Sequence, residues 1–105
     1  MSRKLDAAIA EALGMNVLWS CGQPRAKGDV VPYYSIDGNA MLELDREMQE
    51  RKYELALWHV DERYYAVYDL CGEGIEDVYD SIDREMPKTV ALAAYKALTG
   101  KEWTE

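Results

Sequence analysis

The apolar positions of the chain follow a helical period in three segments, near its start, in its middle and near its end. Leu5, Ile9 and Leu13 recur four residues apart, and Gly14 follows as a natural stop. The middle segment carries a stripe of Ala40, Met41, Leu44 and Met48. The last segment runs up to Gly100 and carries Val90, Ala91, Ala94, Ala97 and Leu98. This pattern predicts three amphipathic helices.

Local signals predict where the second and third helices begin. Ser35 has the hydroxyl of an N-cap residue, and Asp37 would place negative charge in the first turn, where the helix dipole favours it. Farther along the same helix, Glu47 and Arg51 are spaced for an ion pair. Pro87 suits the first position of the third helix, because that position needs no backbone N–H.

Strand-like runs lie between the helical segments. Residues 15–20 read as a short strand, and residues 21–32, with two glycines and two prolines, as a loop or irregular hairpin. Residues 53–60 and 63–68 are two β-rich runs joined by a short charged turn, which predicts a hairpin with His59 in a central strand. Both runs are apolar on each face, so we expect this sheet to be covered on both sides.

The order of these elements predicts an α+β fold. We expect an α-β-α layered sandwich, in which a small, mainly antiparallel sheet carries the three helices on its two faces. The length fits a single domain, residues 1–105, with a core over about residues 4–100. The short C-terminal tail, residues 101–105, has only Trp103 to anchor it.

The formal net charge of −8 narrows the partners that the chain can bind. It argues against direct nucleic-acid binding and against binding to anionic membranes, since both depend on basic residues. No apolar stretch is long enough for a signal peptide or a membrane span, so we expect a cytoplasmic protein. Cys21 and Cys71 are too few for a disulfide framework, and the sequence leaves open whether they lie near each other.

The negative charge is concentrated in residues 69–85. This segment holds seven carboxylates and one basic residue, Arg84, and so carries six of the eight net negative charges. A short edge strand at residues 75–79 would present these carboxylates along one side of the sheet. One interpretation is a solvated connection, and the other is a docking surface for a basic protein. The candidate partner-binding residues are Asp69, Glu73, Glu76, Asp77, Tyr79, Asp80 and Asp83.

Three stretches together resemble the small "ABA sandwich" proteins encoded by tailed bacteriophages and prophages. They are residues 9–15 (IAEALGM), residues 32–37 (PYYSID) and residues 87–98 (PKTVALAAYKAL). The tyrosine- and tryptophan-rich hairpin also fits, so the resemblance spans roughly residues 5–100. One departure is Met86, which stands where the family often has a threonine that can cap the closing helix.

The resemblance implies a phage accessory protein with an α-β-α layered fold and no assigned activity. Our leading hypothesis is therefore a non-enzymatic protein that binds a host macromolecule through its acidic surface. A host-defence complex that handles nucleic acid, such as CRISPR, is the partner we consider, because carboxylates along an edge can imitate a phosphate backbone to it. An enzyme is the least supported class: His59, the one histidine, has no identifiable nucleophile beside it.

Two other hypotheses remain open on sequence alone. The chain could bind a small ligand such as a nucleotide signal, with Arg25, Lys27 and Trp58 forming the site. An oligomeric pocket would suit that function, and the sequence leaves a homodimer open. The chain could also be a virion or assembly component. We expect no cofactor and no metal, because the acidic segment lacks the alternating ligands and central glycine of a calcium loop.

Overall fold

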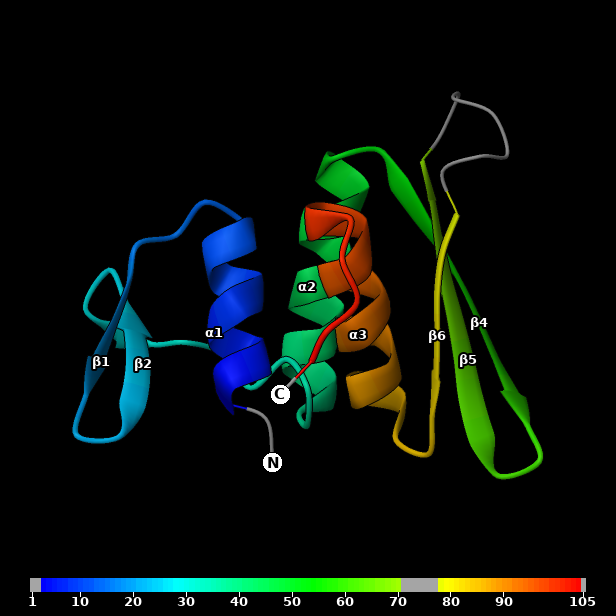
Figure 1. Ribbon diagram of the computed structural model, residues 1–105, viewed down its shortest axis with the longest axis horizontal. Helices are drawn as coiled ribbons and strands as arrows, with labels where there is room; N and C mark the ends of the chain where they lie inside the picture. Colours follow the sequence, from blue (N-terminus) through cyan, green and yellow to red (C-terminus); the bar gives the residue numbers. More distant parts are fainter. Residues whose placement is uncertain (1–2, 71–77, 105) are drawn as a thin grey trace.

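The computed structural model describes residues 3–70 and 78–104, and within them it has three helices and six strands. All strand pairs are antiparallel, and the strands form two small sheets. We name these sheet A, which contains β1, β2 and β3, and sheet B, which contains β4, β5 and β6. The predicted α+β class and layered architecture are confirmed (Figure 1).

The three predicted helices are present, and their apolar stripes form the core. They are α1 (Arg3–Ala12), α2 (Gly38–Glu50) and α3 (Met86–Thr99). In α1, Leu5 and Ile9 are fully buried, as are Leu44 and Met48 in α2. The buried side of α3 is mostly alanine, and small side chains allow neighbouring elements to approach closely. Packing on α3 comes from α1, α2, β5 and β6, so α3 is the centre of the core.

The helix starts differ from the sequence prediction in one case and agree closely in the other. Ser35 is not the cap of α2, because the helix begins three residues later and Asp37 accepts the N–H of Asn39. The backbone N–H of Ser35 instead donates to Asp6, which holds Ser35 outside the helix. In α3 the proline lies in the first turn, one residue after Met86, and Gly100 ends the helix in a left-handed conformation with φ of 74°.

Sheet A is formed by the short strand predicted at residues 15–20 and by the predicted loop or irregular hairpin at residues 21–32. Its strands are β1 (Val17–Ser20), β2 (Gln23–Ala26) and β3 (Asp29–Val30), in that order. The sheet packs on α1 through β1 and β2. Pro24 of this sheet is buried, whereas Leu18 and Trp19 are exposed.

Sheet B contains the predicted hairpin. It is made of β4 (Tyr53–Val60), β5 (Arg63–Leu70) and β6 (Val78–Asp83), with β5 in the middle. The prediction that His59 lies in a central strand is therefore wrong, since β4 is at an edge. Asp61 and Glu62 form the turn between β4 and β5 with positive φ values of 49° and 64°. Such values are typical of the tight two-residue turns that match the twist of a hairpin.

The layers are stacked with the helices between the two sheets (Figure 1). Sheet A lies against α1, while α2 and α3 cover one side of sheet B. None of the described elements covers the other side of sheet B, which differs from the expected sheet with helices on both faces. The apolar residues of β4 explain the difference: Leu55 and Leu57 face the core, but Trp58 and Val60 are about half exposed.

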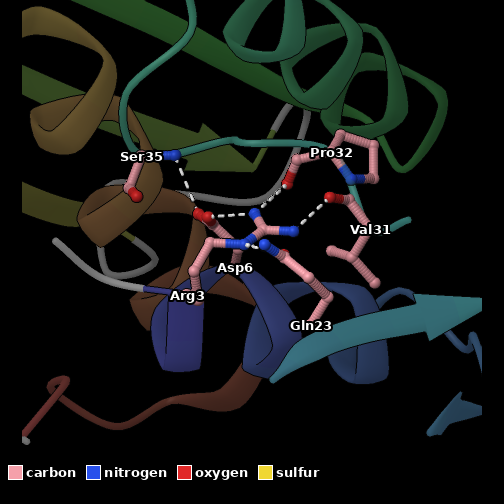
Figure 2. A network of polar contacts seen from close by, with 6 residues as sticks. All are labelled: Arg3, Asp6, Gln23, Val31, Pro32 and Ser35. Carbon is pink, nitrogen blue, oxygen red and sulfur yellow. Dashed lines mark hydrogen bonds and ion pairs between the residues drawn. The ribbon is translucent and has the colours of Figure 1, made fainter. Parts of the chain in front are cut away.

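A buried ion pair ties α1 to the segment that leads from sheet A to α2 (Figure 2). The Arg3 Nη1 atom lies 2.6 Å from Asp6 Oδ2, and the Asp6 side chain is only 1% exposed. Arg3 also donates to the carbonyl oxygens of Val31 and Pro32, at 2.6 and 3.2 Å. The other carboxylate oxygen of Asp6 accepts the N–H of Ser35 at 2.9 Å. The pair is thus satisfied on both sides by backbone groups, as a buried charge requires.

Replacing Asp6 with alanine should destabilise the fold strongly. The substitution leaves the Arg3 guanidinium without its carboxylate and the buried N–H of Ser35 without an acceptor. We expect the free energy of unfolding in urea to fall by about 3–5 kcal/mol. Glu11→Ala, at an exposed position of the same helix, is the control and should change it by less than about 0.5 kcal/mol. Equal effects of the two substitutions would contradict the role given to Asp6.

Candidate functional site

Sheet B has an outer face, turned away from α2 and α3, that strand alternation builds from three strands (Figure 1). Directly opposed residues of neighbouring strands share a face. The strand register places Tyr65 between Trp58 and Ile82, and it pairs Ala56 with Val67. The Trp58 and Tyr65 rings are in contact, with centroids 5.0 Å apart. On this face Trp58 and Ile82 are about half exposed, whereas Val67, which lies between Ala56 and the Asp80 position of β6, is buried.

The predicted acidic segment does lead into a strand at the edge of sheet B. Within the described residues that strand is β6, and it shares Val78 and Tyr79 with the edge strand expected at residues 75–79; residues 75–77 lie outside the described residues. Tyr79 and Asp80 belong to its backbone ladder, opposite Tyr68 and Val67 of β5. Asp69 is exposed at the end of β5, and Glu54, also exposed, lies directly opposite it on β4. Glu73, Glu76 and Asp77 lie outside the described residues.

Asp83 has a local structural role that the sequence prediction did not assign to it. Its Oδ1 atom accepts the backbone N–H groups of Arg84 and Glu85, at 2.7 and 3.3 Å. Its Oδ2 atom lies 3.8 Å from Lys88 Nζ. These contacts shape the connection from β6 into α3 and partly neutralise the carboxylate, so Asp83 is the least available of the described acidic candidates.

The residues of the alternative ligand site are not brought together. Arg25 lies in β2 and Lys27 in the turn after it, both in sheet A, whereas Trp58 lies in sheet B. The two sheets are at opposite ends of the molecule's longest dimension, 41 Å, with the helices between them (Figure 1). The nearest hydrogen-bond partner of Arg25 is local, the carbonyl of Gly28 at 3.5 Å. A single ligand cannot contact all three side chains within one chain.

A polar groove at the end of α2 is the feature that sequence reasoning missed. It has a volume of about 500 Å³ and is lined by Asp45, Gln49, Lys52, Tyr53, Glu54 and Leu55. Asp45 accepts hydrogen bonds from the Tyr68 hydroxyl at 3.0 Å and from Gln49 at 2.8 Å. Asp45 and Gln49 are four residues apart, so their contact within α2 could be predicted from the sequence. The contact with Tyr68 could not, because this tyrosine belongs to β5. Both carboxylate oxygens of Asp45 thus accept a hydrogen bond, and the bond from Tyr68 holds α2 against sheet B.

Other candidate chemistry takes ordinary structural roles. His59 is exposed and its ring stacks on that of Tyr64, with centroids 4.6 Å apart. Cys21 is exposed, while Cys71 lies outside the part of the chain that the structure describes. Among the described residues, no group of three or more histidines, cysteines and acids is arranged to hold a metal ion.

Comparisons of the chain with protein-family models, with curated proteins and with solved structures give no match. The resemblance to phage ABA sandwich proteins therefore stays a prediction from the sequence. None of the described helices combines the length and hydrophobicity needed to cross a membrane.

Alkaline pH should destabilise the fold through two buried tyrosines. Burial, followed by the nearby Glu43, Glu47 and Asp6, raises the pKa of Tyr34 from 10.0 to about 12. Burial and then Asp45 raise the pKa of Tyr68 as well. Above pH 10 the unfolded chain releases these protons and the folded chain keeps them, so ionisation favours unfolding.

The stability that these tyrosines contribute should be complete below pH 10 and decline as pH rises through about 12. Urea denaturation at a series of pH values measures the decline. A Tyr34→Phe/Tyr68→Phe variant lacks both phenols and should lose less stability over that range than the wild type. The same loss in both proteins would rule out these tyrosines as its source.

Proposed function

We propose that the chain is a non-enzymatic accessory protein that binds a host macromolecule through the acidic edge of sheet B. This acidic edge is β6 together with residues 69–77, which lead into it. The observation that carries the proposal is the position of β6 as an outer strand. The segment with most of the net charge therefore ends in a strand that is fixed by its ladder to β5 and backed by α3.

A partner with a basic surface suits this edge. Carboxylates gathered along one edge attract a basic surface over a distance set by the salt concentration. Protein complexes that handle nucleic acid have such surfaces, because they bind phosphate groups. The resemblance to phage proteins adds the expectation that the partner belongs to the host, with a CRISPR-like defence complex as the leading class. The host cytoplasm is the compartment in which the two would meet.

The proposal includes no chemical step. His59 is stacked on Tyr64 and exposed, which gives the imidazole a packing role. The chain's own copies are not the partner that the acidic edge fits, since two edges of the same charge repel each other.

Removing charge from the acidic edge should weaken partner binding. We expect Asp77→Asn together with Asp80→Asn to reduce binding to a complex captured from host lysate by about tenfold and to flatten its salt dependence. Duplex DNA added at rising concentration should compete with the wild-type protein for the same complex. Asp83 is left unchanged, because its carboxylate holds the turn into α3.

Glu43→Gln together with Glu50→Gln is the matched control. Both residues are exposed on α2, and the double substitution removes the same amount of charge away from sheet B. An equal loss of binding in the two double variants would show that net charge, and not the acidic edge, attracts the partner. Failure of the wild type to retain any complex at low salt would refute the proposal as a whole.

A further inference from the structure

The free edge of β4 is a long stretch of backbone with little protection against pairing. β4 is an end strand of sheet B, and no described strand pairs with its other side (Figure 1). Its eight residues, Tyr53–Val60, include one acid, Glu54, and no lysine, arginine or proline. Natural proteins usually keep exposed sheet edges short or place charges and prolines on them, because the edge of a strand can pair with another chain. The edge of β4 therefore has the properties of a contact surface.

The other end strand of sheet B, β6, differs from β4 in this respect. It is six residues long, it contains Asp80 and Asp83, and it follows the acidic segment. Two such acidic edges repel each other. Of the two edges of sheet B, β4 is therefore the one at which pairing with a second copy meets the least opposition.

Charges of opposite sign flank the two ends of β4. Lys52 is exposed just before the strand, and Asp61 and Glu62 are exposed in the turn just after it. Lys52 lines the polar groove with Asp45 and Glu54, but its ammonium forms an ion pair with neither of them. The edge thus has a basic end, a mainly apolar middle and an acidic end. An antiparallel copy of the same edge presents this order in reverse, as a two-fold contact requires.

We propose that β4 pairs with β4 of a second copy of this chain, antiparallel and about a two-fold axis perpendicular to the sheet. The two copies of sheet B then form one continuous sheet with three strands from each chain. The axis must fall on a residue, because opposed residues have to lie on the same side of the sheet. An axis at Leu57 sets Lys52 of each copy opposite Glu62 of the other. An axis at Trp58 would set Glu54 against Glu62, where like charges oppose the contact.

The side chains of β4 fit the axis at Leu57. On the outward side, Trp58 lies opposite Ala56 of the other copy, so a large ring that is 47% exposed in the single chain gains a small neighbour. On the inward side the two Leu57 side chains meet, and each already packs on its own core. The backbone adds about one hydrogen bond per residue of the strand. The contact therefore covers apolar surface and satisfies the edge of the backbone together.

The dimer is compatible with the acidic edge, because it leaves β6 as the outermost strand at both ends of the joined sheet. The two copies of β6 would be separated by five strand spacings, roughly 24 Å. This separation exceeds the screening distance in physiological salt, about 8 Å, so the two acidic edges do not oppose the contact. One particle would then present two acidic edges.

Charge exchange between positions 52 and 62 tests the pairing. Sedimentation equilibrium at low salt, over a concentration series, should show self-association of the wild-type chain. Lys52→Glu alone sets two acids against each other twice per dimer, and Glu62→Lys alone does the same with lysines, so each variant should dimerise about tenfold more weakly. An equimolar mixture of the two variants should regain dimers, because both contacts in the mixed dimer join opposite charges. Lys27→Glu, at an exposed lysine of sheet A that also has a positive φ, is the matched control and should dimerise as the wild type does.

Amide hydrogen exchange locates the contact within sheet B. As the protein concentration rises, amides of β4 should exchange more slowly and those of β6 should not, because only β4 gains hydrogen bonds. Circular dichroism checks that every variant is folded. A wild-type chain that stays monomeric over the whole series overturns the inference, as does a mixture of charge variants that does not dimerise, or slower exchange in β6 instead of β4. A monomeric chain leaves the acidic-edge proposal intact, since that proposal is tested at positions 77 and 80.

Discussion

The carboxylate of Asp6 joins parts of the chain that have few other contacts with one another. On one side it neutralises Arg3, whose guanidinium holds the carbonyl groups of the segment that leaves sheet A. On the other side it accepts the N–H of Ser35, just before α2 begins. The Arg3 guanidinium also lies 3.7 Å from the centre of the Tyr33 ring. The path from sheet A to α2 is therefore set by one charge on α1, and the place of sheet A in the fold depends on that charge.

The opposite end of α1 is held by a second guanidinium. Arg51, at the end of α2, donates to the carbonyl of Leu13 at 3.1 Å and pairs with Glu47 within its own helix. Between these two polar anchors the helices meet through the alanines of α3, which have almost no side-chain freedom to lose on burial. The result is a central helical layer that packs closely and supports a sheet on each side.

Much of the fold follows from local sequence patterns, and the differences have identifiable causes. The three helical stripes and the hairpin at residues 53–68 depend on neighbouring residues, so the sequence predicts them correctly. The N-cap of α2 is set by tertiary structure: the N–H of Ser35 donates to Asp6, 29 residues away, and Ser35 therefore lies outside the helix. The division into two sheets also has no local signal, and apolar residues on both sides of β4 suggested a covered sheet.

The candidate site shows the same limits of sequence analysis. Charge counting located the acidic segment, and the structure gives its last strand an edge position. The sequence could not separate Asp83, which holds a turn, from Asp69, which is exposed at the end of β5. The sequence also could not show that Arg25 and Trp58 lie in different sheets, because the separation of the two sheets depends on how the helices pack between them. The Tyr68–Asp45 hydrogen bond was missed for a similar reason, as its partners are 23 residues apart.

The two-residue turn at Asp61 and Glu62 has a consequence for how this protein can change in evolution. The turn fixes the pairing of β4 with β5, and a slip of one residue would exchange the inward and outward sides of the hairpin. With the pairing held constant, alternate positions of β4 are under separate constraints. Leu55 and Leu57 must fit the helices, whereas Trp58 and Val60 can be replaced without disturbing them. New binding specificities can therefore arise on the outward positions while the inward ones keep the fold.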